Sequence, residues 1–155
     1  MRILVLSIML LFGANAYVGD SIDAPGKVFY KLPDESIVKR DVVLTVPSRG
    51  EGKVYLRSGR ISVEAARFFS RELNGRTIFY VIFDQYPGQS SENELAVYRG
   101  TYTRGSNLAL YYGDVFKVGR STAMADQDEL HLDLTENSGI SPKYIAGFYF
   151  KYEIE

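Results

Sequence analysis

The sequence of 155 residues contains no cysteine, no tryptophan and a single histidine, His131. Without cysteine there is no disulfide scaffold, no thiolate metal site and no thiol catalysis, so an apolar core must hold the fold. The formal charge is −1, from 18 basic and 19 acidic residues, and this balance does not suggest a nucleic-acid partner. The sequence also lacks a phosphate-binding loop, a dinucleotide fingerprint and a zinc-ligand pattern, so we expect no cofactor.

Long apolar runs are missing as well. No segment reaches the roughly eighteen apolar residues of a membrane helix, so we expect no membrane span in the mature chain. The run 3–12 is shorter, follows Arg2 and precedes Ala14-Asn15-Ala16, which is the order of a secretory signal peptide. The sequence contains no Asn-x-Ser/Thr sequon, so nothing in it indicates a eukaryotic secretory route. We therefore expect export to a bacterial periplasm or exterior. The expected organisation is a signal peptide over 1–16 and one β domain over 17–155, of which 17–25 is a loose leader.

The clearest pattern in the sequence is a β-hairpin over 95–118. Two runs rich in β-branched and aromatic residues flank a short polar segment that contains Gly105 and Ser106. This pair suits a type II′ turn with a positive φ at the glycine. The predicted register places each strand glycine opposite a tyrosine, Gly100 with Tyr111 and Gly113 with Tyr98, so that a ring covers each glycine.

The two faces of this hairpin differ in polarity. One face carries tyrosine and glycine and no charge, and we expect it to be packed. The other face carries Arg99 and Asp114 at mid-strand, where burial of a charge is costly, and we expect it to be partly hydrated.

Tyrosine is the one compositional excess, with 12 residues in the chain. Tyrosine gives a large contact area and a polar tip, which suits a binding surface, although it is also an ordinary strand residue. The residues that we consider for a ligand or interaction surface are Tyr98, Arg99, Tyr102, Tyr111 and Tyr112.

The segment 61–73 fits two structures. Val63, Ala66 and Phe69 have helical spacing, but Asn74-Gly75 follows and is the strongest short signal for a hairpin. We favour a strand over 66–73, and the pairs that the turn then fixes are Glu72 with Thr77, Ser70 with Phe79 and Phe68 with Val81. The following segment, 76–86, is apolar on both faces and predicts a central strand, or a strand under a second layer.

The segment 129–134 alternates leucine with polar residues and predicts a strand, preceded by a long loop over 119–128. His131 then lies on a hydrated face, where its loss would cost little. A Ser-His-Asp site is not favoured, because His131 and Asp133 would flank each other on one strand face.

Further strands are expected over 27–32, 37–46, 53–57 and 144–154. On the last of these, Tyr144 is expected on the same face as Ala146 and Phe148. About eight to nine short strands joined by tight turns predict an all-β, single-domain antiparallel fold. A β-sandwich and a small closed β-barrel fit this pattern equally well.

Acidic residues give two weak candidates for chemistry. Asp126, Asp128 and Glu129 could offer oxygen ligands to Ca²⁺, but the spacing is not that of a known calcium loop, and a solvated loop fits better. Paired carboxylates could also run glycoside hydrolysis. The candidates for such a pair are Asp84, Glu94 and Asp114.

These observations favour a non-catalytic exported binding or interaction module, with a protein or glycan ligand, over an enzyme, because no nucleophile–base or metal constellation can be assembled. The alternative is a lipocalin-like barrel that carries a small apolar ligand, by analogy of architecture. A hydrolase with a carboxylate pair is the third hypothesis. A filled core would favour the first hypothesis and an internal apolar cavity the second.

Overall fold

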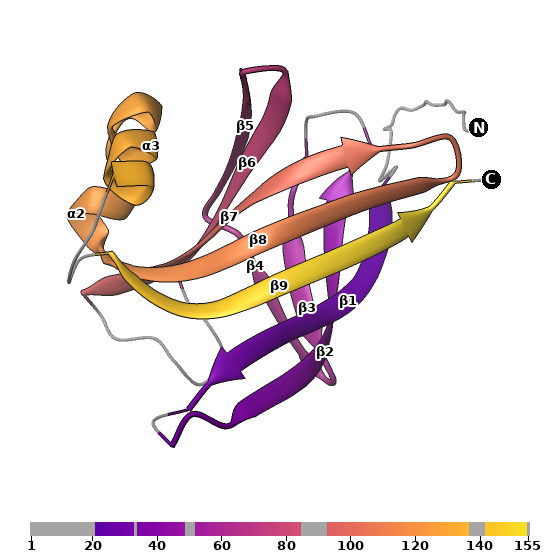
Figure 1. The fold of residues 1–155 in the computed structure, drawn as a ribbon, viewed down its shortest axis with the longest axis horizontal. Helices are drawn as coiled ribbons and strands as arrows, with labels where there is room; N and C mark the ends of the chain where they lie inside the picture. Colours follow the sequence, from indigo (N-terminus) through magenta and orange to yellow (C-terminus); the bar gives the residue numbers. More distant parts are fainter. Residues whose placement is uncertain (1–20, 33, 49–51, 85–92, 137–141, 155) are drawn as a thin grey trace.

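The computed structural model describes residues 21–32, 34–48, 52–84, 93–136 and 142–154. Within these residues the chain forms nine antiparallel strands and two short helices, which confirms the all-β prediction (Figure 1). The strands are β1 (Ser21–Lys31), β2 (Ile37–Pro47), β3 (Tyr55–Ser58), β4 (Ile61–Glu64), β5 (Arg67–Leu73), β6 (Arg76–Phe83), β7 (Glu94–Arg104), β8 (Leu108–Gly119) and β9 (Lys143–Glu153). The helices are α2 (Arg120–Ala123) and α3 (Gln127–Glu136).

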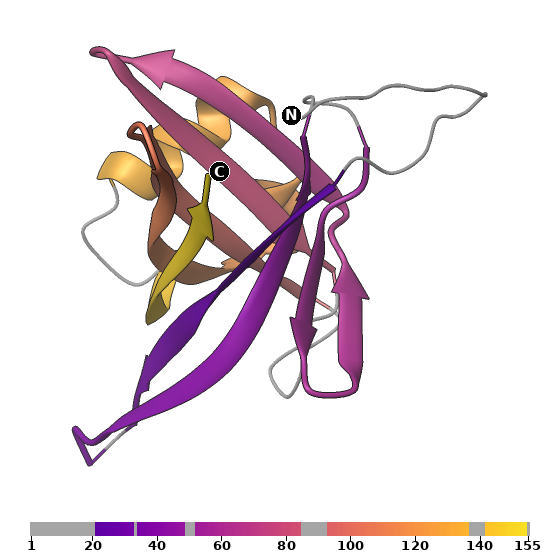
Figure 2. The same cartoon turned by 90° about the vertical axis from the view of Figure 1, so that its right-hand side faces the viewer.

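All the described strands belong to one sheet, in the order β4-β3-β2-β1-β9-β8-β7-β6-β5. The sheet curls into a half-barrel, as the view turned by 90° shows (Figure 2). Its two edge strands, β4 and β5, follow each other in the chain. Between them, the Ala65 amide donates to the Val54 carbonyl and the Ala66 amide donates to the Ile82 carbonyl. The chain therefore steps from one edge of the sheet to the other, and the two edges approach each other at this step without pairing as strands.

The β5–β6 hairpin has the predicted turn and register. Asn74 and Gly75 adopt positive φ angles of 54° and 78°, as a type I′ turn requires. The predicted pairs are confirmed: Glu72 faces Thr77, Ser70 faces Phe79 and Phe68 faces Val81. Strand pairing therefore prevailed over the helical spacing in 61–73, because the turn commits both flanking segments to an extended conformation.

The β7–β8 hairpin is present, but its predicted turn and register are wrong. The Gly105 amide donates to the Leu108 carbonyl, so Ser106 and Asn107 form the loop, and Gly105 has no positive φ. The register is shifted by two residues, so that Gly100 faces Gly113 and Tyr102 faces Tyr111. A shift of two preserves which side chains share a face, because side chains alternate with a period of two. The predicted division into two faces therefore survives the error.

The expected loose leader is wrong from Ser21 onward. β1 begins at Ser21, and Ala24 within it is fully buried opposite Leu44 of β2. Pairing with β2 continues through the whole of β1, so this segment is part of the sheet. Residues 17–20 and the predicted signal peptide at 1–16 lie outside the described residues.

The strand predicted over 129–134 is wrong, because this segment forms most of α3. Leu130 and Leu134 are buried, whereas Leu132 is 55% exposed. The spacing of four between the two buried leucines is shared by a strand face and a helix face, so the alternation alone could not decide. The loop predicted over 119–128 also contains a helix, α2.

The sheet has a core on each of its faces. The concave face holds the larger core, with side chains from most strands. On the convex face, α2 and α3 cover part of β6, β7 and β8 and bury Leu130, Leu134 and Ala123 there. β6 contributes to both cores, with Phe79 and Val81 on the concave side and Tyr80 on the convex side. The prediction that both faces of this strand are covered is confirmed, with the helices as the second layer on the convex side, although β6 lies next to the edge strand β5 and not in the centre of the sheet.

Candidate binding surface on the convex face

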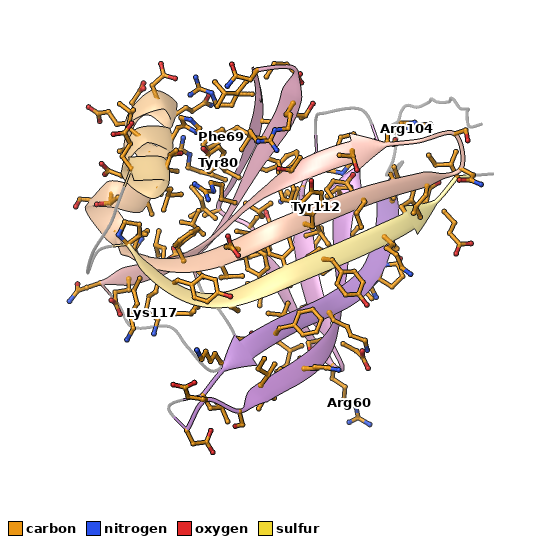
Figure 3. The ribbon with its side chains drawn as sticks, viewed as in Figure 1. Arg60, Phe69, Tyr80, Arg104, Tyr112 and Lys117 are labelled. Atoms are coloured by element: carbon orange, nitrogen blue, oxygen red, sulfur yellow. The ribbon has the colours of Figure 1, made fainter. Side chains whose placement is uncertain are left out.

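The structure does not bring the five residues predicted as an interaction surface together. Tyr98 is 1% exposed and belongs to the concave core. Tyr102 and Tyr111 pack against the same core, with ring centroids 4.8 Å apart. Arg99 and Tyr112 lie on the opposite, convex face, where Figure 3 shows Tyr112 away from α3. Neighbouring strand residues point to opposite faces, so a set that includes consecutive residues cannot form one surface.

The concave face of the half-barrel is filled by the protein's own side chains. Among them, Phe83 and Phe150 are fully buried, and Tyr98 packs with Phe148 at a ring centroid distance of 5.0 Å. Phe79 contacts Phe148 and Tyr111 through edge-to-face ring packing. This aromatic core occupies the space in which a barrel-type carrier holds its ligand.

His131 lies at the junction between α3 and the sheet, not on a hydrated strand. Its Nδ1 is hydrogen-bonded to the hydroxyl of Tyr80, a residue of β6 that is fully buried. Beside it, Arg71 of β5 donates to the Asp128 carboxylate at 2.6 Å. These two contacts connect the polar side of α3 to the convex face (Figure 3, where Tyr80 lies beside the helix).

We expect the free energy of unfolding to decrease as the pH falls below 6.5, the usual pKa of a histidine side chain. Burial lowers the pKa of His131 from its usual 6.5, with the nearby Arg71 and Arg99 acting in the same direction and Asp128 against it. The unfolded chain therefore takes up a proton at a higher pH than the folded one. The stabilisation from neutral His131 is complete above pH 6.5 and is lost as the pH falls through the lower, folded-state pKa.

Urea unfolding at about pH 7.5 and about pH 5.5 would measure this loss, and the sole imidazole can be titrated directly by NMR. The matched control is His131→Gln, in which this part of the pH dependence should disappear. An NMR pKa at or above 6.5 would contradict the prediction.

The acidic residues considered as calcium ligands have other roles. The Asp126 side chain accepts the backbone N–H of Asp128 at 3.0 Å, as a residue at the start of a helix does. Asp128 pairs with Arg71. Glu129 lies in the first turn of α3, where a negative charge favours the helix dipole. In the described part of the chain, no group of three or more His, Cys, Asp or Glu side chains is arranged to hold a metal ion.

The three carboxylates considered for hydrolysis are not brought together either. Asp84 forms an ion pair with Arg120 at 2.6 Å. Glu94 lies at the start of β7, opposite Gly119 in the register, whereas Asp114 lies in the middle of β8, opposite Arg99. The alternation along the strands also places Glu94 and Asp114 on opposite faces of the sheet.

The convex face of β1, β9 and β8 carries aromatic residues beyond the part that α2 and α3 cover. We call Phe29, Tyr112 and Tyr149 the aromatic strip. Tyr112 faces Tyr149 directly across β8 and β9, and the ring centroids of Phe29 and Tyr149 lie 5.9 Å apart. Tyr112 is 39% exposed, and Phe29 and Tyr149 are partly exposed. Three strands thus present neighbouring rings to the outside.

Polar groups adjoin the aromatic strip around Gly147. In the register, Gly147 of β9 lies between Phe29 of β1 and Asp114 of β8. A β-bulge between Val115 and Phe116 makes Tyr144 the partner of Phe116. The Tyr144 hydroxyl lies 3.5 Å from the position that a Cβ on Gly147 would occupy. The prediction that Tyr144 shares a face with Ala146 and Phe148 is therefore wrong, because an inserted residue reverses the alternation.

Asp114 is a half-buried carboxylate, and none of the described residues donates a hydrogen bond to it. Burial raises its pKa, and the Arg99 guanidinium opposes that shift. Arg99 itself donates to the Leu134 carbonyl at the end of α3 and lies over the Phe116 ring. The same carboxylate, together with burial, raises the pKa of Tyr144. The protein thus keeps an acceptor with free lone pairs beside the aromatic strip.

Comparison with protein-family models, with curated proteins and with solved structures found no significant match. Among the described residues, no helix is long and apolar enough to cross a membrane.

No pattern in the sequence singled out Phe29, Tyr144, Gly147 and Tyr149 as surface residues. The alternation in 144–154 did indicate that Gly147 and Tyr149 oppose the core residues. The pairing of β1 with β9, which places Phe29 beside them, joins segments more than a hundred residues apart and has no local signal.

Proposed function

We propose that this protein is a non-catalytic exported binding module and that the aromatic strip is its binding surface. The main support for this proposal is the contrast between the two faces of the sheet. The concave face is filled by its own aromatic core, whereas on the convex face Phe29, Tyr112 and Tyr149 remain partly exposed. Tyrosine and phenylalanine give a rigid contact area at a small cost in side-chain entropy, which suits recognition.

The interactions of the candidate catalytic residues support a binding role over catalysis. His131 is engaged by Tyr80, and Asp84 is engaged by Arg120. In the described sheet, Asp114 faces Arg99 and Gly147, and neither offers the second carboxylate that glycoside hydrolysis needs. A site that binds without reacting needs only shape, rings and a few polar groups, and the convex face supplies these.

The order of the N-terminal residues supports a ligand outside the cytoplasm. A signal peptide over 1–16 would deliver the β domain to the periplasm or exterior of a bacterium. The ligand is then a component of the envelope or of the surroundings. Intact-mass measurement of the exported protein should give a chain that begins at Tyr17.

A lipocalin-like carrier with a closed barrel is the second candidate. The curl of the sheet and the direct step from β4 to β5 favour it. The filled concave core weakens it, because a carrier needs a space of a few hundred Å³ inside the barrel. An apolar fluorescent probe that gained fluorescence on a saturable site would support the carrier and count against the proposed module.

Co-sedimentation with cell envelopes of the source organism tests the proposed function. We expect the wild-type protein to pellet saturably with the envelopes, and the double variant Tyr112→Ala/Tyr149→Ala to stay in the supernatant. Both side chains are partly exposed, so their truncation should leave the fold intact. The matched control is Tyr55→Ala, a partly exposed tyrosine on the convex side of β3, away from the strip.

Equal pelleting of the wild-type protein and the double variant would show that the aromatic strip is not the binding surface. Absence of any saturable pelleting would remove the support for an envelope ligand. Loss of binding in Tyr55→Ala to the same extent would point to a surface on β3 instead.

A further inference from the structure

Five residues on the convex face form a compact group, which we call the Gly147 site: Phe29, Asp114, Tyr144, Gly147 and Tyr149. They come from three adjacent strands and are joined by the register of β1, β9 and β8. The group combines two aromatic rings, one phenol hydroxyl, one carboxylate and a strand position without a side chain. Each of these groups can contribute to binding the same kind of ligand.

The strand position without a side chain, Gly147, is the least expected feature. A Cβ on Gly147 would lie 3.5 Å from the Tyr144 hydroxyl, 3.7 Å from the Gly113 carbonyl and 4.0 Å from an Asp114 carboxylate oxygen, all ordinary contacts. The backbone of Gly147 has no positive φ that would demand glycine. Glycine weakens a strand interior, and it often marks a place where a ligand approaches the backbone closely.

The Asp114 carboxylate and the Tyr144 hydroxyl border this empty position. The carboxylate is half-buried, and no described residue hydrogen-bonds to it, so its acceptor sites are available. The Tyr144 hydroxyl can both donate and accept. A β-bulge is what turns Tyr144 to this side, and bulges are frequent where a side chain is aimed at a binding or active site.

We infer that the Gly147 site binds one ring of a neutral sugar chain. The apolar C–H face of the ring packs against Phe29 and Tyr149, and the ring edge sits over the bare backbone of Gly147. Two neighbouring sugar hydroxyls donate to the Asp114 carboxylate, and a third pairs with the Tyr144 hydroxyl. This inference rests on the proposed function, and it names the class of ligand for that surface.

The charge of the site decides between sugar classes. A free carboxylate accepts hydrogen bonds from hydroxyl groups, and these charge-assisted bonds are strong. The same carboxylate repels the acid groups of uronic or sulfated sugars. Lys27 lies nearby, opposite Tyr149, but it is paired with Asp41 and does not reverse this preference.

Isothermal titration calorimetry with maltohexaose, cellohexaose and hexa-N-acetylchitohexaose, with polygalacturonate as the anionic contrast, tests the inference. We expect saturable binding of at least one neutral oligosaccharide and none of polygalacturonate. Gly147→Val should fill the empty position, and Asp114→Asn should remove the charged acceptor. We expect each variant to weaken binding by about tenfold or more, without loss of folded structure in thermal melts.

The matched control is Gly119→Val, at the far end of the same β8 strand that carries Asp114, where a Cβ meets no atom within 4 Å. Its binding should equal that of the wild-type protein. Failure of all three neutral oligosaccharides to bind would overturn the inference, and so would binding that Gly147→Val leaves unchanged. If the envelopes still bind through the aromatic strip in that case, the proposed module stands and its ligand is not a neutral sugar. If neither binds, both proposals fail.

Discussion

Gly113→Ala should destabilise the protein by at least about 3 kcal/mol, at the top of the range for overpacking or beyond it. A Cβ on Gly113 would lie 2.2 Å from the Arg99 carbonyl oxygen and 2.5 Å from the Cα of Gly100. Both atoms belong to the backbone of the paired strand β7, so no side-chain rotation can relieve the collision. The strands would have to separate at the position where two glycines face each other.

The reason for this glycine differs from the one that the sequence predicted. With the predicted register, Gly113 makes room for the ring of Tyr98. In the structure it makes room for the backbone of β7. A neighbouring glycine, Gly147 of β9, supplies the control, because its Cβ would meet only ordinary contacts. Denaturant unfolding should show a large loss for Gly113→Ala and little change for Gly147→Ala. Similar effects in the two variants would show that close backbone contact is not what Gly113 provides.

His131→Ala should destabilise the protein by about 1–3 kcal/mol, because it leaves the hydroxyl of the fully buried Tyr80 without its partner. This reverses the expectation from the sequence, which placed His131 on a hydrated strand where its loss would cost little. The control on the same helix is Leu132→Ala. Leu132 is 55% exposed, and its truncation should change the stability by less than about 0.5 kcal/mol.

A double-mutant cycle with Tyr80→Phe separates the hydrogen bond from the packing of the two rings. If the hydroxyl of Tyr80 matters through His131, then Tyr80→Phe should cost less in the His131→Ala background than in the wild-type protein. We expect a coupling free energy of about 1 kcal/mol from chemical unfolding. Additive effects of the two substitutions would mean that the contact does not hold α3 to the sheet.

Local chemistry explains which features the sequence could predict. Asn74-Gly75 determines the β5–β6 register by itself, because a two-residue turn with positive φ at both positions leaves one way to pair the strands. The apolar character of both faces of 76–86 likewise follows from residues within that segment. The all-β class needs only such local signals, repeated along the chain.

The error in the β7–β8 turn shows where local chemistry is insufficient. Gly105-Ser106 and Ser106-Asn107 both suit a tight turn, and the two choices differ in register by two residues. Both keep the same side chains on each face, so the hydrophobic pattern could not separate them. The close approach of Gly100 and Gly113, which only one register allows, belongs to the assembled sheet.

The sequence by itself determined most of the strands, the two covered faces of β6 and the alternation that separates the two faces of the sheet. Only the tertiary structure decided that 127–136 is a helix, because the spacing of Leu130 and Leu134 suits both periods until a convex face is there to bury them. It also decided the Gly147 site, which needs the pairing of β1 with β9 and the bulge beside Phe116. Contacts between distant segments and an inserted residue that reverses a face depend on how the whole sheet assembles, and no short stretch of sequence specifies them.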